Sequence, residues 1–501
     1  MKKILTIVLD GFGYREEKYG NAIIEADPKN FNRLWENYSH SLLWASEEPI
    51  GLLKGQFGNS EVGHMTIGAG RKLKQDVDRI HNFIDNAIEE DEKYQNLIQK
   101  CKEKNNKVHI MGLFSDGLVH SDMNHFLKLF EHLVNDGVKN IYFHLITDGR
   151  DTKTTDAYKY IQVLEEKINE LEVGSIATIC GRFYGMDRDN KLDRTKTYYD
   201  LITTGTGALA KSIEGAINSC YKKKVTDEFI PPILFDSKGL IEDGDIVIWM
   251  NYRTDRAKQI LDSLTNKDYN NFPVVSYNDL EVYTFVPIDK KIKTISFLEE
   301  ECVENPLGIY LSKLGLSQAR IAETEKYAHV TYFFDGLYNG TIENCTKVLV
   351  PSLKVKTYDQ DPRMSAVEIT KEAVMCMERD LDFIFVNFAN PDMVGHTGNY
   401  EATVKAIMAV DVCLGKLLEE AENNFYKVIV TADHGNADMM LDKDENPVTT
   451  HTLSKVPFII VDESITLKEE GDLTNIAPTI LDYMDIALPK EMKDSESLII
   501  K

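Results

Sequence analysis

The sequence has no long hydrophobic run and no paired cysteine motif. No segment of its 501 residues approaches the roughly 20 apolar residues that a membrane-spanning helix needs. The apolar run at residues 4–9 follows two lysines, as in a signal peptide, but it ends at Asp10 after about the length of a strand. We therefore expect a buried strand at residues 4–9 and no association with a membrane.

Positive charge is scarce: 57 Lys and Arg stand against 81 Asp and Glu, for a formal charge of -24. This charge repels nucleic acid and anionic membranes over most of the surface, so we expect neither as a partner. An anionic substrate then needs a local basic pocket. The seven cysteines are widely spaced and contain no Cys-x-x-Cys pair, which favours reduced thiols in the cytoplasm.

The length of the chain exceeds what one hydrophobic core usually supports, so we expect two or three domains. Short runs rich in Val and Ile alternate with segments of helical periodicity, which predicts an α/β fold with parallel sheets covered by helices. The predicted strands are residues 4–9, 108–113, 140–146, 175–179, 245–250, 383–388, 427–431 and 456–461. The predicted helices are residues 122–135, 156–171, 400–422 and 474–484.

Acidic and imidazole side chains collect at the ends of predicted strands, where doubly wound sheets bind ligands. They are Asp10, Asp392, His396, Asp433, His434 and His451. Such a set without cysteine favours manganese or zinc over magnesium and is large enough for two ions. Two ions would clamp the attacking and leaving oxygens of a phosphoryl displacement. Taken singly, Asp10 is also typical of a turn and Asp392 of a helix cap.

A hydroxyl group in a glycine-rich segment, Ser60, is the candidate nucleophile. The neighbouring Gly58 and Gly63 let the backbone approach a phosphate closely, and a helix start can hold phosphate oxygens. No Ser-His-Asp spacing is visible, so coordination to a metal ion is the simplest way to activate this hydroxyl. The alternative is that Ser60 only caps a helix.

Five arginines follow predicted strands in the middle of the chain. They are Arg150, Arg182, Arg188, Arg253 and Arg256. The planar guanidinium matches both carboxylate and phosphate, which indicates a small substrate that carries both groups. For Arg188 the alternative is a surface ion pair. His120 and Lys326, taken individually, are more typical of surface or structural residues.

Seven segments, taken together and in order, resemble the cofactor-independent, or 2,3-bisphosphoglycerate-independent, phosphoglycerate mutase family of the alkaline phosphatase superfamily. They are LDG (9–11), GNSEVGH (58–64), DGRDT (148–152), GRFY (181–184), ETEKY (323–327), NPDMVGH (390–396) and TADHGN (431–436). The chain departs from the family pattern at Phe12, Leu118, Asp122 and Asp335 to Leu337, none of which is a presumed ligand.

The resemblance implies an isomerase of glycolysis and gluconeogenesis that interconverts 3-phosphoglycerate and 2-phosphoglycerate through a phosphoserine at Ser60. It also implies a discontinuous alkaline-phosphatase-like metal domain, residues 1–74 and 302–501, with an inserted α/β substrate-binding transferase domain, residues 75–301. We expect a cytoplasmic monomer. A phosphatase or another phosphomutase with the same metal centre is the nearest alternative, and a non-catalytic metal-stabilised binding protein is a more distant one.

The resemblance further assigns roles to individual residues. By the resemblance there would be two divalent ions, both Mn²⁺. One would be held by Asp392, His396 and His451, and the other by Asp10, Ser60, Asp433 and His434. The phosphate would be bound by His120, Arg253, Arg256 and Lys326, and the glycerate by Arg150, Arg182 and Arg188. Asp151 would move protons at the substrate hydroxyl.

Overall fold

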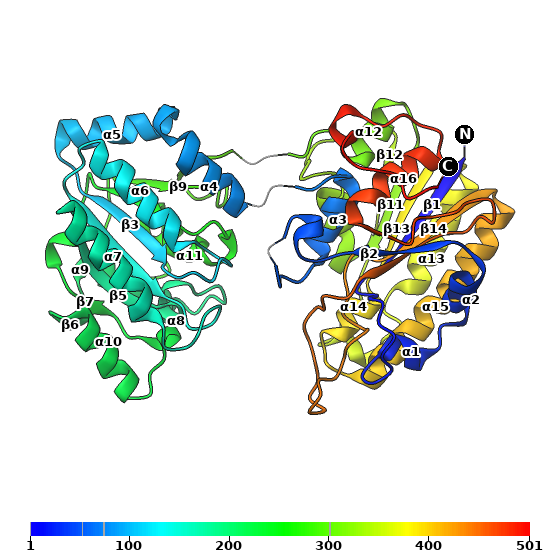
Figure 1. The fold of residues 1–501 in the computed structure, drawn as a ribbon, viewed down its shortest axis with the longest axis horizontal. Helices are drawn as coiled ribbons and strands as arrows, with labels where there is room; N and C mark the ends of the chain where they lie inside the picture. The colour runs from blue at the N-terminus through cyan, green and yellow to red at the C-terminus, as the bar shows by residue number, and fades with distance from the viewer. Residues whose placement is uncertain (1, 53, 74–75, 300–301, 501) are drawn as a thin grey trace. The chain divides into compact units, whose positions relative to one another are not determined.

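The computed structural model describes residues 2–52, 54–73, 76–299 and 302–500. The chain forms two compact units, Met1–Leu73 with Glu301–Lys501 (unit 1) and Lys74–Glu300 (unit 2) (Figure 1). Each unit has its own eight-stranded sheet and its own hydrophobic core. Within the described ranges, no helix has both the length and the apolar character to cross a membrane.

The sheet of unit 1 joins segments from both ends of the chain. Its strands, in spatial order, are β12 (Cys345–Val350), β11 (Gln318–Glu323), β13 (Phe383–Phe388), β1 (Lys3–Leu9), β14 (Tyr426–Thr431), β15 (Val456–Ile460), β2 (His40–Trp44) and β16 (Glu470–Asp472). The first five strands of this order, from β12 through β11, β13 and β1 to β14, run parallel to one another. β15 runs antiparallel to both of its neighbours, β14 and β2. β1 therefore lies at the centre, between β13 and β14.

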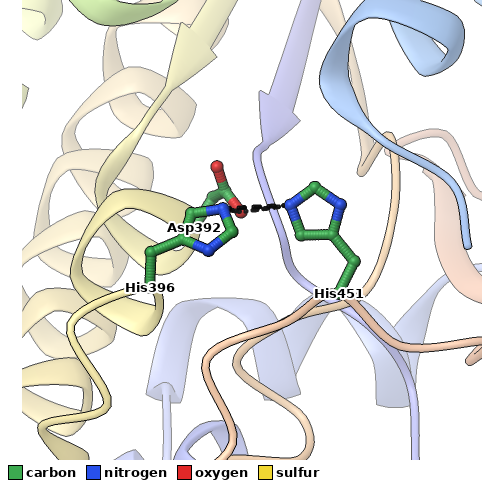
Figure 2. Close-up of side chains that lie close together, drawn as sticks. All are labelled: Asp392, His396 and His451. Atoms are coloured by element: carbon green, nitrogen blue, oxygen red, sulfur yellow. Dashed lines mark hydrogen bonds and ion pairs between the residues drawn. The ribbon is translucent and has the colours of Figure 1, made fainter. Parts of the chain in front are cut away.

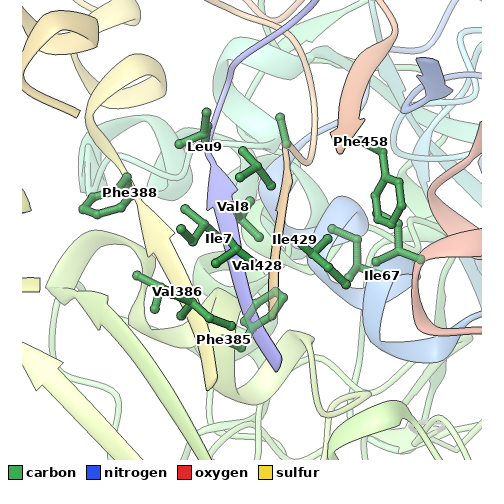
Figure 3. Close-up of a cluster of buried hydrophobic side chains, with 14 of the residues drawn as sticks. Ile7, Val8, Leu9, Ile67, Phe385, Val386, Phe388, Val428, Ile429 and Phe458 are labelled. Carbon is green, nitrogen blue, oxygen red and sulfur yellow. The ribbon is translucent and has the colours of Figure 1, made fainter. Parts of the chain in front are cut away.

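Helices cover this sheet and bury its central strands. They are α1 (Ala22–Ala26), α2 (Lys29–Asn37), α3 (Ser60–Ala69), α12 (Leu307–Lys313), α13 (Ala366–Glu378), α14 (Asn390–Gly395), α15 (Tyr400–Asn423) and α16 (Ile476–Tyr483). The helices α1, α2, α13 and α14 pack against α15, and the helices α12 and α16 pack against α3. Apolar side chains of β1, β13 and β14, among them Ile7, Phe385 and Val428, interlock in one core (Figure 3).

Unit 2 is built on a second, mostly parallel sheet. Its strands, in spatial order, are β10 (Ile295–Ser296), β9 (Glu281–Thr284), β8 (Ile246–Trp249), β3 (Val108–Leu113), β4 (Ile141–Thr147), β5 (Ser175–Gly181), β7 (Ile233–Leu234) and β6 (Ala208–Leu209). Its helices are α4 (Asp76–Asn86), α5 (Glu92–Lys104), α6 (Met123–Asn135), α7 (Ala157–Leu171), α8 (Arg182–Gly185), α9 (Leu192–Thr204), α10 (Ile213–Lys222) and α11 (Lys258–Thr265). Two separate apolar clusters form its core.

The predicted α/β class is confirmed, and all eight predicted strands and four predicted helices are present within a few residues of their expected bounds. The expectation of parallel sheets fails at β15, because no crossover helix separates it from β14 and the chain can return antiparallel. The expected domain boundaries fall at residues 74, 75 and 301, which lie outside the described ranges.

Candidate active site

Most of the predicted metal ligands follow three neighbouring parallel strands of unit 1. Asp10 follows β1, Asp392 follows β13, and Asp433 and His434 follow β14, so the carboxyl ends of these strands bring them to one edge of the sheet. His451 precedes β15, whose antiparallel direction puts the start of this strand at the same edge. The candidate ligand atoms form two groups, and within each group all of them lie within 4.8 Å of one another. The first group is Asp392, His396 and His451, and the second is Asp10, Asp433 and His434.

The first group is shown in Figure 2. The Nε2 atoms of His396 and His451 lie 3.0 Å apart, and Asp392 Oδ1 lies 3.2 Å and 3.3 Å from them. Each ring uses Nδ1 to contact a backbone carbonyl oxygen, of Thr449 and Gly58 respectively, at 2.8 Å. Because a carbonyl only accepts, each Nδ1 carries a proton, and in the neutral rings both Nε2 lone pairs face one point beside a carboxylate. This arrangement fits a divalent metal ion.

The second group surrounds the hydroxyl of Ser60. Ser60 Oγ lies 3.2 Å from Asp10 Oδ1 and 3.0 Å from His434 Nε2, and all three side chains are buried. Asp433 Oδ2 is also buried and accepts no hydrogen bond, although His64 Nδ1 lies 3.2 Å from it, so this carboxylate oxygen still has room for another ligand. The oxygen and imidazole donors therefore fit a second metal ion that includes Ser60 among its ligands.

Lys326 connects the two groups. Its Nζ atom lies 2.7 Å from Asp10 Oδ1, 2.6 Å from Asp392 Oδ2 and 2.6 Å from Ser60 Oγ. Burial by itself lowers the pKa of Lys326, but the charges of Asp10 and Asp392 more than offset this and raise it. The ammonium group is therefore retained in the interior, 2.6 Å from the candidate nucleophile.

The buried carboxylates of Asp10 and Asp392 stay ionised beside Lys326. Burial raises the pKa of Asp10 and of Asp392, but Lys326 and the neighbouring histidines lower both pKa values by more. Burial likewise lowers the pKa of His434, whereas Asp433 and Asp10 raise it to about 9. Ionised carboxylates in a desolvated pocket need cationic partners, so the pocket favours cations.

Local structure explains how these side chains are positioned. Asn59, not Ser60, caps α3, because its side chain accepts from the Val62 N–H at 2.9 Å, so the interpretation of Ser60 as a helix cap is wrong. Asp392 lies inside α14 and is not its cap, so that alternative is wrong as well. Gly11 has φ +75°, and a Cβ there would lie 2.8 Å from Asp392 Cα, so glycine permits the close approach of this turn to α14.

The predicted substrate residues other than Lys326 lie in unit 2, after four neighbouring parallel strands. His120 follows β3, Arg150 and Asp151 follow β4, Arg182 follows β5, and Arg253 and Arg256 follow β8. Arg182 Nη1 donates to Asp148 Oδ1 at 2.7 Å and to Asp151 Oδ2. Its side chain is almost completely buried, so this ion-pair cluster fixes its direction.

Arginines gather closely enough in unit 2 to affect one another. Burial lowers the pKa of Arg256, and the charges of Arg188 and Arg182 lower it further. Burial, followed by the charges of Arg182 and Arg253, lowers the pKa of His120 to about 3, so this imidazole is neutral at physiological pH. The cluster is a cationic site suited to an anion.

For His120 and Lys326 the sequence left a surface or a structural role open as the alternative to ligand binding, and the surface alternative is wrong, since each is only 3% exposed. The sequence could not reveal this, because neither follows its strand directly. Arg188 forms the ion pair that the sequence offered as the alternative to substrate binding: its Nη1 donates to Asp255 Oδ2 at 2.9 Å. Its guanidinium nonetheless lies close enough to Arg256 to lower the pKa of that residue.

Three residues that contact the candidate ligands were not singled out from the sequence. Asn387 Nδ2 donates to Asp10 Oδ2 at 2.7 Å, and Asn436 Nδ2 donates to Asp392 Oδ1 at 2.8 Å. His64 Nδ1 lies 3.2 Å from Asp433 Oδ2. The available signal for Asn387 was a polar side chain inside the apolar run of β13, where an unpaired amide would be costly.

Comparison with known proteins places this site in context. The chain matches the Metalloenzyme superfamily over residues 2–488. It is 42% identical over 501 residues to the 2,3-bisphosphoglycerate-independent phosphoglycerate mutase of Staphylococcus epidermidis and 43% identical over 496 residues to that of Bacteroides thetaiotaomicron, with 98% of each chain covered in both cases. The crystal structure of Leishmania mexicana phosphoglycerate mutase at low cobalt concentration matches with a TM-score of 0.70 and 30% identity, over 100% of this chain and 98% of that one.

Proposed function

Because the chain belongs to the 2,3-bisphosphoglycerate-independent phosphoglycerate mutase family, we propose that it is an isomerase that interconverts 3-phosphoglycerate and 2-phosphoglycerate in glycolysis and gluconeogenesis. The observation that carries this proposal is the environment of Ser60. Its Oγ atom lies within 3.2 Å of a carboxylate, an imidazole and an ammonium group, in a buried pocket that favours cations. No bisphosphoglycerate cofactor is required.

The protein binds divalent metal ions, and we propose two Mn²⁺ sites in unit 1. Asp392, His396 and His451 would hold one ion, and Asp10, Ser60, Asp433 and His434 the other. Mixed carboxylate and imidazole donors suit Mn²⁺ better than Mg²⁺. When bound, the two ions neutralise charge on the transferring phosphoryl group and favour loss of the Ser60 proton.

Ser60 is the proposed phosphoryl acceptor. In the first transfer, the bond from phosphorus to O3 of 3-phosphoglycerate breaks as the bond from phosphorus to Ser60 Oγ forms. In the second transfer, O2 of the glycerate attacks the phosphoserine and Ser60 Oγ leaves. Lys326 stabilises the negative charge that Ser60 Oγ carries before and after these steps, since Nζ lies 2.6 Å from this oxygen.

Unit 2 is the proposed substrate-binding transferase domain, and unit 1 the metal domain. Arg150, Arg182 and Arg188 would hold the glycerate, and His120, Arg253 and Arg256 would bind the phosphate together with Lys326. Asp151 would give a proton to O3 when this atom leaves and take the proton of O2 when this atom attacks, so its protonation state is restored in each cycle. Retention of glycerate between the two transfers makes the reaction an isomerisation.

Two further expectations accompany this assignment. The seven cysteines without a Cys-x-x-Cys pair and the glycolytic role favour a cytoplasmic protein. We also propose that it acts as a monomer, since a single chain supplies every residue assigned to the reaction.

A direct assay tests the function. The metal-depleted protein is incubated with 3-phosphoglycerate, with and without Mn²⁺ and without bisphosphoglycerate, and the products are followed by ³¹P NMR. We expect 2-phosphoglycerate to form only with the metal. Release of inorganic phosphate without 2-phosphoglycerate would identify a phosphatase instead, and the absence of any reaction with Mn²⁺ would overturn the proposal.

A further inference from the structure

We infer that Asn387 and His64 are positioning residues that hold Asp10 and Asp433 in the geometry needed to bind a metal ion. The inference rests on the proposed function, because it concerns the same ligands. Asn387 lies in β13 and His64 in α3, and both side chains are 0% exposed. Neither is among the proposed metal ligands.

The orientation of the Asn387 amide is determined by Asp10. Asp10 Oδ2 lies 2.7 Å from Asn387 Nδ2, and an ionised carboxylate can only accept a hydrogen bond. A flipped amide would point its oxygen at this carboxylate. In the observed orientation Asn387 Oδ1 is buried and accepts no hydrogen bond, which is unfavourable for a polar atom. The amide therefore bears an unsatisfied oxygen so that its N–H groups can face the site.

The amide in turn determines which nitrogen of His64 carries the proton. His64 Nε2 lies 3.0 Å from Asn387 Nδ2, so the second N–H of the amide donates to it and Nε2 must be the accepting nitrogen. The proton of the neutral ring is then on Nδ1. This N–H donates to the backbone oxygen of Ser60 at 2.9 Å and lies 3.2 Å from Asp433 Oδ2.

One polar chain thus links β1, β13, α3 and the end of β14. It begins at Asp10 and passes through Asn387 and His64 to the backbone of Ser60 and the carboxylate of Asp433. The close approach of α3 requires Gly63, because a Cβ there would lie 2.7 Å from the Asp433 backbone oxygen. Of the four ligands proposed for one ion, Asp10 accepts a hydrogen bond from Asn387, and His64 donates to the backbone of Ser60 and lies beside the carboxylate of Asp433.

Asn387→Leu tests the inference, because leucine has a similar volume and removes both N–H groups. Metal-free protein is titrated with Mn²⁺, and the free ion is measured by electron paramagnetic resonance. We expect the affinity of one of the two sites to fall roughly 10- to 100-fold, as is typical when a partner of a metal ligand is lost. His64→Phe is the second variant, with the same expected loss, and His64→Gln should recover part of the affinity because glutamine can still accept from Asn387.

The matched control is Asn21→Ala. Asn21 is also buried, 1% exposed, but its amide donates to the backbone oxygens of Arg15 and Glu17, away from the ligands. We expect this variant to melt at a lower temperature and to bind Mn²⁺ as the unmodified protein does. Folded Asn387→Leu or His64→Phe protein with unchanged affinity would overturn the inference, as would an equal loss in Asn21→Ala. Unmodified protein that binds two Mn²⁺ ions without mutase activity would refute the proposed function alone.

Discussion

The Nε2 atoms of His396 and His451 lie 3.0 Å apart, although each ring already uses Nδ1 to contact a backbone oxygen. Two neutral rings held in this way direct two lone pairs at each other. A shared cation removes this repulsion, and Asp392 Oδ1, 3.2 Å and 3.3 Å away, completes the set of donors. This relationship supports the proposal that Asp392, His396 and His451 hold a metal ion.

Removal of metal should therefore destabilise the protein. A ligand that binds only the folded state at 100 times its Kd contributes about 2.7 kcal/mol to the free energy of unfolding. We expect dialysis against a chelator to lower the melting temperature and abolish activity, and Mn²⁺ to restore both. Equal melting temperatures for metal-free and Mn²⁺-loaded protein would contradict the assignment.

Ser60→Ala should remove the phosphoryl acceptor. We expect mutase activity to fall by at least roughly 1000-fold, since the other groups at the site cannot form the covalent intermediate. Mass spectrometry of the unmodified protein quenched during turnover should find phosphate on Ser60 and none in the variant. The phosphoserine mechanism fails if the variant retains activity within tenfold of the original.

Arg253→Ala should weaken substrate binding with little effect on folding, because this side chain is half exposed. Loss of a hydrogen bond between charged groups costs about 1.5–3 kcal/mol, which corresponds to a decrease in kcat/KM of roughly 10- to 150-fold. Lys104→Ala is the control, because Lys104 is an exposed cation of unit 2 that pairs with Asp279. Steady-state kinetics that show equal effects for both variants would argue against a specific role for Arg253.

His144 makes unit 2 sensitive to acid. Burial and the neighbouring His109 lower its pKa well below the ordinary 6.5, so the unfolded chain takes up a proton near pH 6.5 and the folded chain does not. The free energy of unfolding must therefore fall as the pH drops below 6.5, by up to about 2 kcal/mol between pH 7 and pH 5. The hydrogen-bond partners of His144 include His109 and Thr178, which also lie in unit 2, so its effect is separate from the metal site proposed in unit 1.

The check is urea unfolding of the original protein and His144→Gln at both pH values. Glutamine keeps a polar contact with Thr178 but does not titrate, so the variant should lose less stability at pH 5. Equal losses would show that His144 does not contribute to the acid sensitivity.

The sequence predicted the strands with strong apolar runs and the ligands that follow them directly, such as Asp10 and Asp433. Short or polar edge strands, such as β6 and β16, carry too little apolar pattern to be recognised. The surface alternative for Lys326 was wrong because the carboxylates that it contacts are 66 and 316 residues away in the chain. The contacts of Asn387 were hidden for the same reason, since only the paired register of β1 and β13 brings it beside Asp10.

Anomalous diffraction from a crystal grown with Mn²⁺ tests the central claim most directly. We predict two anomalous peaks in unit 1, one in contact with Asp392, His396 and His451, and the other in contact with Asp10, Asp433, His434 and the hydroxyl of Ser60. A peak that lies elsewhere, or an occupied metal site from which the hydroxyl of Ser60 points away, would contradict the account.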